Sequence, residues 1–220
     1  MEQKVLRAVM VCLLLMSMAI LGRETATYVE TVNVVNALQG NNADTDGIPT
    51  VVIDAGHGGD DPGKIGINGA PEKDINLRIT EKLRQYLEAD GIRVVLTRET
   101  EDGLYDASAP NKKVQDMKRR IEKIEQTDPV LTVSIHQNKF TQSQYDGTQV
   151  FYSGNHEESR LLASAIRESV TGLLQPDNTR ELKKGDSNIY LLYKATRPAV
   201  LVECGFLSND AELRRLKDPD

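Results

Sequence analysis

The sequence predicts an α/β fold, in which a mostly parallel twisted sheet is flanked by helices. From Pro49 onward, short runs rich in β-branched residues alternate with longer stretches whose apolar residues recur at helical spacing. Gly91 follows the first helical stretch, and Asp128 and Pro129 follow the second, as expected where helices end. This alternation is typical of parallel strands that are joined by helices.

Several short runs have the composition of strands, because β-branched and aliphatic residues suit the extended backbone of a sheet. The first, over 50–54, reads Thr-Val-Val-Ile-Asp, and the last, over 199–204, reads Ala-Val-Leu-Val-Glu-Cys. Both are almost entirely apolar, which indicates burial on both faces. We place strands at 50–54, 92–97, 130–136, 147–152, 189–193 and 199–204.

Three longer stretches carry apolar residues three and four positions apart, the spacing that places them on one helical face. Nearer the end of the chain, Asn209 followed by Glu212 has the pattern of a helix N-cap and its capping-box partner. The apolar positions are Ile75, Ile79, Leu83, Tyr86 and Leu87 in the first stretch (72–90), Val114, Met117, Ile121 and Ile124 in the second, and Leu161, Leu162, Ala165, Ile166, Val170 and Leu173 in the third.

The composition fits one domain and argues against a nucleic-acid-binding protein. The chain has 220 residues, and its 39% of hydrophobic residues can build a core. Acidic residues outnumber basic ones, 33 to 27, which gives a net charge of −6. Nucleic-acid-binding proteins usually carry a basic face. The chain also has no tryptophan, so an aromatic platform for stacking bases is not expected.

The first 23 residues have the pattern of an export signal. Lys4 and Arg7 precede an apolar stretch over about 8–21, which is shorter than the ~20 residues of a membrane-spanning helix. A clear cleavage site is missing, so an uncleaved membrane anchor is an alternative, as is a buried helix of the fold. The polar segment over 24–48 is interpreted as a linker, and 49–220 as the folded domain. We therefore expect this domain to act outside the cytoplasmic membrane.

Polar residues stand at the ends of three predicted strands. Asp54 ends the first and His57 comes soon after it. His136 ends the third, with Asn138 two residues later, and Glu203 lies near the end of the last. In sheets of this class, ligands bind outside the carboxyl ends of the strands. Such residues are therefore expected to share one edge.

The first helix begins with Glu72 and Asp74, so its start can meet the same edge. Two imidazoles and one carboxylate with an open fourth position are a common ligand set for catalytic zinc. A further carboxylate could act as the general base.

Simpler interpretations exist for each of these residues. A histidine in a loop is usually solvated, and His156 is interpreted in this way. A glutamate at a helix start, such as Glu72, usually serves the helix dipole. Glu203 is less easily explained, because an ionised carboxylate within an apolar strand is costly unless it is paired. The ligands are too scattered for a local motif, so the residues alone indicate a metal hydrolase without naming its reaction.

Five motifs, spread from about residue 50 to 217, together resemble the zinc-dependent N-acetylmuramoyl-L-alanine amidases often called type 3. They read IDAGHGGDDPG, PEKDINL, LTRET, SIHQN and PAVLVECGFLSN, in this order. The resemblance implies the phosphorylase/hydrolase-like amidase fold and one Zn²⁺ ion. It implies that His57, Glu72 and His136 hold zinc, that Glu203 is the catalytic carboxylate, and that Asp54, Asp74 and Asn138 support the ligands or orient the substrate.

The implied reaction is hydrolysis of the amide between N-acetylmuramic acid and L-alanine in peptidoglycan. The segment SNIYLLYKATRPAVLVECGFLSN is most similar to the sporulation and germination amidases, which implies spore-cortex peptidoglycan as the substrate. Whether an accessory protein binds the domain, for example to load zinc, stays open. Two other functions stay open at this point: a wall-binding or partner-binding module without catalysis, and another zinc hydrolase of peptidoglycan, such as a carboxypeptidase or deacetylase.

Two features depart from the expected pattern. Similar enzymes continue with another helix beyond the position of Asp220, so we expect the sequence to be a truncated form. Cys204 directly follows Glu203 and could in principle bind zinc. Successive strand residues point to opposite faces, however, which predicts a buried structural thiol. The other cysteine, Cys12, lies in the apolar N-terminal stretch, so no disulfide is expected within the domain.

Overall fold

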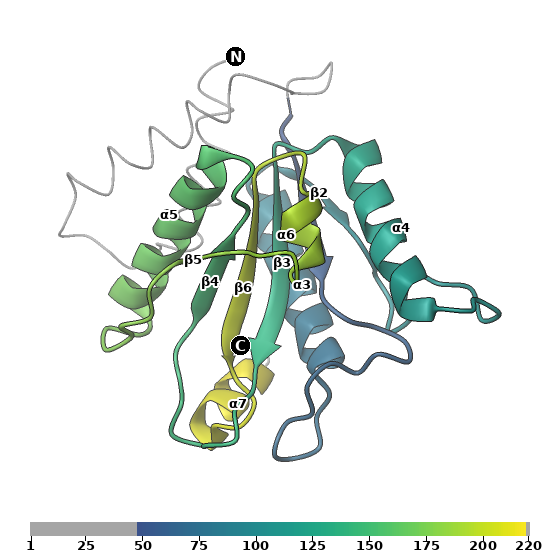
Figure 1. Cartoon of the computed structure of the whole chain (residues 1–220). Coiled ribbons are helices and arrows are strands. Elements are labelled where there is room, and N and C mark those ends of the chain that lie inside the picture. The colour runs from purple at the N-terminus through teal and green to yellow at the C-terminus, as the bar shows by residue number, and fades with distance from the viewer. Residues whose placement is uncertain (1–47, 219–220) are drawn as a thin grey trace.

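A computed structural model of the protein describes residues 48–218 (Figure 1). The predicted export signal over 1–23 lies outside the described residues, as does nearly all of the predicted linker over 24–48. Within 48–218, no helix is both long enough and apolar enough to cross a membrane.

A single mixed sheet forms the centre of the fold and confirms the predicted class. Its strand order is β2-β1-β3-β6-β4-β5, and every neighbouring pair runs parallel except β4 and β6. The strands are β1 (Thr50–Ala55), β2 (Arg93–Leu96), β3 (Leu131–Asn138), β4 (Gln149–Tyr152), β5 (Lys183–Lys184) and β6 (Ala199–Phe206).

Helices cover both faces of the sheet and bury its side chains. On one face, α3 (Glu72–Ala89) and α5 (Glu157–Leu173) pack on a core cluster that includes Ile53, Val133 and Val202. On the other face, α4 (Lys112–Thr127) and α6 (Tyr190–Lys194) pack on a cluster around Val52 and Leu201. Figure 1 shows α6 in front of the sheet, and α7 (Asp210–Lys217) beyond the carboxyl end of β6.

One predicted strand is wrong. The segment 189–193 forms the short helix α6, whose Leu191 and Leu192 are buried against the sheet. The edge strand of the sheet beside β4 is instead β5, which the sequence analysis did not predict. A short apolar run such as Ile-Tyr-Leu-Leu-Tyr suits either a buried strand or one buried helical turn, and periodicity over five residues does not distinguish them.

The predicted cap of the last helix is only half confirmed. The Asn209 side chain accepts hydrogen bonds from the backbone N–H groups of Ala211 and Glu212, as an N-cap should. The Glu212 carboxylate does not complete a capping box. It accepts instead from the backbone N–H groups of Phe206, at 2.7 Å, and Gly147, at 3.0 Å. Glu212 therefore ties α7 to the end of β6 and to the loop before β4.

Candidate metal centre and active site

The polar residues at the carboxyl edge of the sheet come together as predicted. In the register of the sheet, Asp54 lies beside Ser134, and His136 lies beside Glu203. His57 follows β1 in a sharp turn. Its φ is 63°, and the φ values of Gly58 and Gly59 are also positive. This turn carries the His57 side chain back toward β3.

Three side chains form a compact cluster with the donors that zinc prefers. One ligand atom from each of His57, Glu72 and His136 lies within 4.8 Å of the others. The Glu72 Oε1 atom lies 3.3 Å from His57 Nε2 and 3.1 Å from His136 Nδ1. Two imidazole nitrogens and a carboxylate oxygen match the three protein ligands of a catalytic zinc site. The residues present therefore fit this metal.

The Glu72 carboxylate is held by the backbone as well as by the histidines. It is fully buried, and its Oε1 accepts from Gln137 N at 2.9 Å while its Oε2 accepts from Lys64 N at 2.8 Å. Burial raises the pKa of Glu72, but the hydrogen bonds and charges of the two histidines outweigh burial and lower it below its ordinary value. Glu72 is thus ionised at neutral pH, as a metal ligand must be.

Glu203 reaches the same edge from β6 and has a different environment. Burial raises the pKa of its carboxyl group, and the nearby Lys64 ammonium opposes this shift only in part. Its Oε2 atom is buried, and none of the residues in 48–218 donates a hydrogen bond to it. A carboxyl group with a raised pKa and a free oxygen is suited to accepting and returning a proton.

Asp54 lies behind the cluster instead of among its ligands. It accepts hydrogen bonds from Arg120 at 2.7 Å, from Ser134 at 2.6 Å and from Thr97 at 2.7 Å. Burial raises its pKa, but Arg120 and these hydroxyl groups outweigh burial and lower it to about 2. Arg120 also donates to the backbone carbonyl of His57 at 2.5 Å. Asp54 therefore acts on the site through Arg120 and the turn that carries His57.

The other sequence-predicted residues contact the site less directly. Asp74 lies in the first turn of α3, where its Oδ1 atom is buried without a hydrogen-bond partner among the described residues. Asn138 ends β3, and its side chain accepts from Lys139 N. Neither of them lines the cavity described below. His156 occupies the N-cap position of α5, without a side-chain cap, and lies outside the cluster. Cys204 packs against the core on the face of α3 and α5, as the alternation of strand residues predicts, but it is half-buried and not fully buried.

Several contributors were missed by the sequence analysis. Asp61 Oδ2 accepts a hydrogen bond from His57 Nδ1 at 3.0 Å, and Lys64 lies beside Glu203. Arg120 is 1% exposed and pairs with Asp116 four residues earlier. One signal could have revealed this pair, because residues 116, 120 and 124 share a face of α4 and the last of them is the buried Ile124.

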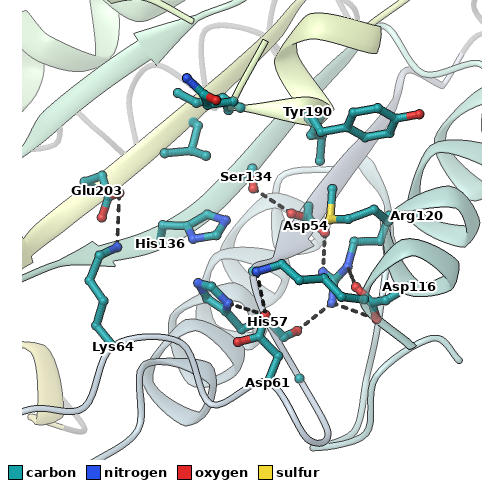
Figure 2. Close-up of a pocket in the computed structure, with 18 of the residues that line it drawn as sticks. Asp54, His57, Asp61, Lys64, Asp116, Arg120, Ser134, His136, Tyr190 and Glu203 are labelled. Atoms are coloured by element: carbon teal, nitrogen blue, oxygen red, sulfur yellow. Dashed lines mark hydrogen bonds and ion pairs between the residues drawn. The ribbon is translucent and has the colours of Figure 1, made fainter. Parts of the chain in front are cut away.

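A cavity of about 630 Å³ extends from the cluster across the sheet face between α4 and α6. Figure 2 shows His57, His136 and Glu203 at one side of it, with Ser134 and Tyr190 further along. Its wall is largely apolar, with contributions from Met117, Phe151, Ile189, Leu191 and Leu201. A concave, mostly apolar cavity with a few convergent polar groups is typical of a ligand-binding or active site.

Residues 51–220 match the protein family described as N-acetylmuramoyl-L-alanine amidase. The chain belongs to this amidase family. The germination-specific N-acetylmuramoyl-L-alanine amidase of Bacillus subtilis is 33% identical to it over 172 residues, which cover 77% of this chain and 71% of the relative. This confirms the enzyme class that the five motifs predict: a hydrolase of the amide between N-acetylmuramic acid and L-alanine in peptidoglycan.

Solved structures agree with the amidase fold. The CwlD amidase from Clostridioides difficile, solved in complex with the GerS lipoprotein, is 42% identical, with a TM-score of 0.74 over 78% of this chain and 89% of that one. The catalytic domain of CwlV from Bacillus (Paenibacillus) polymyxa var. colistinus is 31% identical, with a TM-score of 0.64 over 78% of this amidase and 88% of that chain. The mixed sheet flanked by helices is thus the fold of this family.

Proposed function

We propose that this amidase depends on zinc and removes stem peptides from spore-cortex peptidoglycan. The cluster of His57, Glu72 and His136 carries the zinc proposal, because three suitable donor atoms lie within 4.8 Å beside a carboxyl group with a raised pKa. The cortex proposal is supported by the likeness to a germination-specific relative and to a CwlD amidase. Residues 49–220 are proposed as the catalytic domain.

In the proposed mechanism His57, Glu72 and His136 hold the ion, and Glu203 moves the proton. Zinc supplies Lewis acidity, which polarises a carbonyl and makes a nearby water more acidic. Glu203 accepts a proton as the water oxygen bonds to the lactyl carbonyl carbon. It then donates this proton to the alanine nitrogen as the carbon–nitrogen bond breaks, leaving a carboxyl group and a free amine.

Asp54, Asp74 and Asn138 are proposed to support the site through different contacts. Asp54 and Arg120 hold the backbone of the turn that carries His57, which keeps this ligand in place. Asp74 is proposed to act through the buried Arg98. It raises the pKa of the Arg98 guanidinium, although burial and Arg120 lower that pKa more. Asn138 is proposed to support the ligand His136, because it lies two positions further along β3.

The location and partner are proposed from the N-terminus and from the relatives. Export by residues 1–23 would place the domain on the side of the membrane where peptidoglycan lies. The CwlD structure contains a GerS lipoprotein, and we propose that an accessory lipoprotein also binds this amidase.

The decisive experiment is a digest of cortex and vegetative peptidoglycan, followed by mass spectrometry of the products. We expect whole stem peptides with free L-alanine amino termini, and no release after chelation. Glu203→Gln should lower kcat by about 10²- to 10⁴-fold while zinc binding persists. Glu88→Gln, an exposed change on α3, is the matched control.

Other products would favour other functions. Loss of one residue from the stem would indicate a carboxypeptidase, and loss of acetyl groups a deacetylase. Wall binding by a His57→Ala/His136→Ala double variant, with no hydrolysis by the wild type, would indicate a binding module. Equal release with and without chelator would contradict the zinc proposal.

A further inference from the structure

The ammonium group of Lys64 lies between the two carboxylates of the site. Its Nζ is 3.4 Å from Glu203 Oε1 and 3.5 Å from Glu72 Oε2, and it donates to the Gln137 carbonyl at 2.6 Å. Figure 2 shows the Lys64 side chain directed at Glu203, next to His136. Lys64 follows the glycine-rich turn and lies outside the residues to which the family resemblance gives a role.

We propose that Lys64 is a positioning residue for Glu203, an inference that rests on the proposed function. An ammonium group has three donors, and Lys64 has three acceptors around it. The short bond to Gln137 fixes the head group on β3, the strand next to β6. The fixed cation then holds Glu203 by Oε1, which leaves the unpartnered Oε2 as the oxygen that takes the proton.

The positive charge of Lys64 lies close to the negative charges of both Glu72 and Glu203. Glu72 is fully buried, and the Glu203 side chain is 14% exposed, so two negative groups share a region of low dielectric constant. Like charges in such a region repel strongly. Zinc bound by Glu72 would offset part of this repulsion, and the Lys64 ammonium adds a cation that also pairs directly with Glu203 Oε1. Without this contact, the carboxylate of Glu203 is expected to turn away from its present position.

A purely structural role for Lys64 would be to tie its loop to β3. The chain offers a matched control, because Lys139 makes an equivalent tie nearby. Lys139 Nζ, from just beyond β3, donates to the backbone carbonyl of Ile65 at 2.7 Å. The Lys139 bond thus anchors the residue next to Lys64, and no bond from Lys139 to either carboxylate is present. Removing it should loosen the loop without removing the charge beside Glu203.

The test compares Lys64→Met, and Lys64→Ala as a second neutral variant, with Lys139→Met in the full chain. We expect kcat on peptidoglycan to fall about 10- to 100-fold in the Lys64 variants, with KM within about threefold of the wild type. Zinc affinity, measured by competition with a chelator, should change by less than about threefold, because none of the three ligands is altered. Lys139→Met should keep the wild-type kcat.

Crystal structures of the zinc-loaded proteins supply a readout that does not need activity. The Glu203 carboxylate should be displaced by about 1 Å or more in the Lys64 variants and unmoved in Lys139→Met, a shift large enough to account for the lost rate. An unmoved Glu203, an unchanged kcat, or an equal loss in Lys139→Met would overturn the proposal. If the wild type releases no stem peptides, the proposed function fails, and the position of Glu203 still decides the role of Lys64.

Discussion

At Gly56, the backbone that follows β1 passes directly beside the imidazole ring of His136. A Cβ atom added there would lie 2.2 Å from the Cε1 and Nε2 atoms of His136. No real carbon atom can approach so closely, so any other residue would push the ring or the backbone aside. The close packing of these two strand ends explains why a glycine stands directly before His57.

This packing gives a prediction for Gly56→Ala. The added methyl group should displace the His136 ring from Glu72 and weaken zinc binding by about 10- to 100-fold, measured by chelator competition. Gly91→Ala is the control, because Gly91 has a φ of 81° and open space around its Cα. It should cost roughly 1–2 kcal/mol of unfolding free energy through backbone strain and leave zinc affinity unchanged. Equal zinc affinity in the wild type and Gly56→Ala would contradict the steric argument.

Residues at strand ends were predictable, and residues in the loops were not. His57, His136 and Glu203 each follow or end an apolar run, so the rule that parallel strands finish at one edge places them together. Lys64 follows no such rule. It reaches Glu203, 139 positions away, only because its loop folds back over the sheet edge. Its neighbours in sequence contain no signal of that contact.

At the scale of elements, the contact between α4 and the end of β1 is an ionic one. Arg120 projects from α4 under the turn, where its guanidinium meets Asp54, Asp116 and the carbonyls of Ala55 and His57 (Figure 2). Burial lowers the pKa of Arg120, and the two carboxylates outweigh burial and raise it, so the group stays charged. The helix thereby fixes the backbone that presents a metal ligand.

Removing this guanidinium should therefore destabilise the protein strongly. Arg120→Met leaves the buried Asp54 without its cation and should cost about 3–5 kcal/mol of unfolding free energy, measured by urea denaturation. The neighbouring Arg119 pairs with Asp106 on the surface, and Arg119→Met should have little effect because exposed ion pairs contribute little. Similar losses of unfolding free energy in both variants would show that the buried ion pair stabilises the protein no more than the exposed one.

The short helix α6 shows where prediction of elements fails. Its apolar residues were expected to form a strand, because a run of five cannot reveal a period of 3.6. In the sheet, β4 and β5 occupy the positions beyond β6. Leu191 and Leu192 are buried instead by packing a helical turn onto the sheet face. The longer helices α3 and α4 begin and end close to the predicted positions, since several turns and their end signals lie in the sequence.

On the scale of the whole molecule, the site exists only when the sheet is complete. The site has four central residues, which come from the turn after β1, the start of α3, β3 and β6: His57, Glu72, His136 and Glu203. No two of them are neighbours in the sequence, so local structure alone cannot assemble the site. Stability and zinc binding should therefore be lost together when the sheet unfolds. The buried ion pair of Asp54 and Arg120 should make both depend on pH.

The pH dependence can be assigned partly to Asp54. Its pKa is lowered from 3.8 to about 2 in the folded protein, because Arg120 and the hydroxyl groups outweigh the effect of burial. A group with a lowered folded-state pKa binds its proton more readily when unfolded. Its stabilising contribution is therefore complete above about pH 4 and is lost as the pH falls toward 2. The contribution amounts to about 2 kcal/mol of unfolding free energy.

Urea denaturation between pH 6 and pH 2 measures this contribution directly. The wild type should lose about 2 kcal/mol more between pH 4 and pH 2 than Asp54→Asn, which cannot titrate at this position. Asp90→Asn, at the exposed end of α3, should follow the wild-type curve. If Asp54→Asn instead lost as much stability as the wild type over this range, the acid sensitivity would arise from other carboxylates, and the ion pair with Arg120 would not couple the fold to pH.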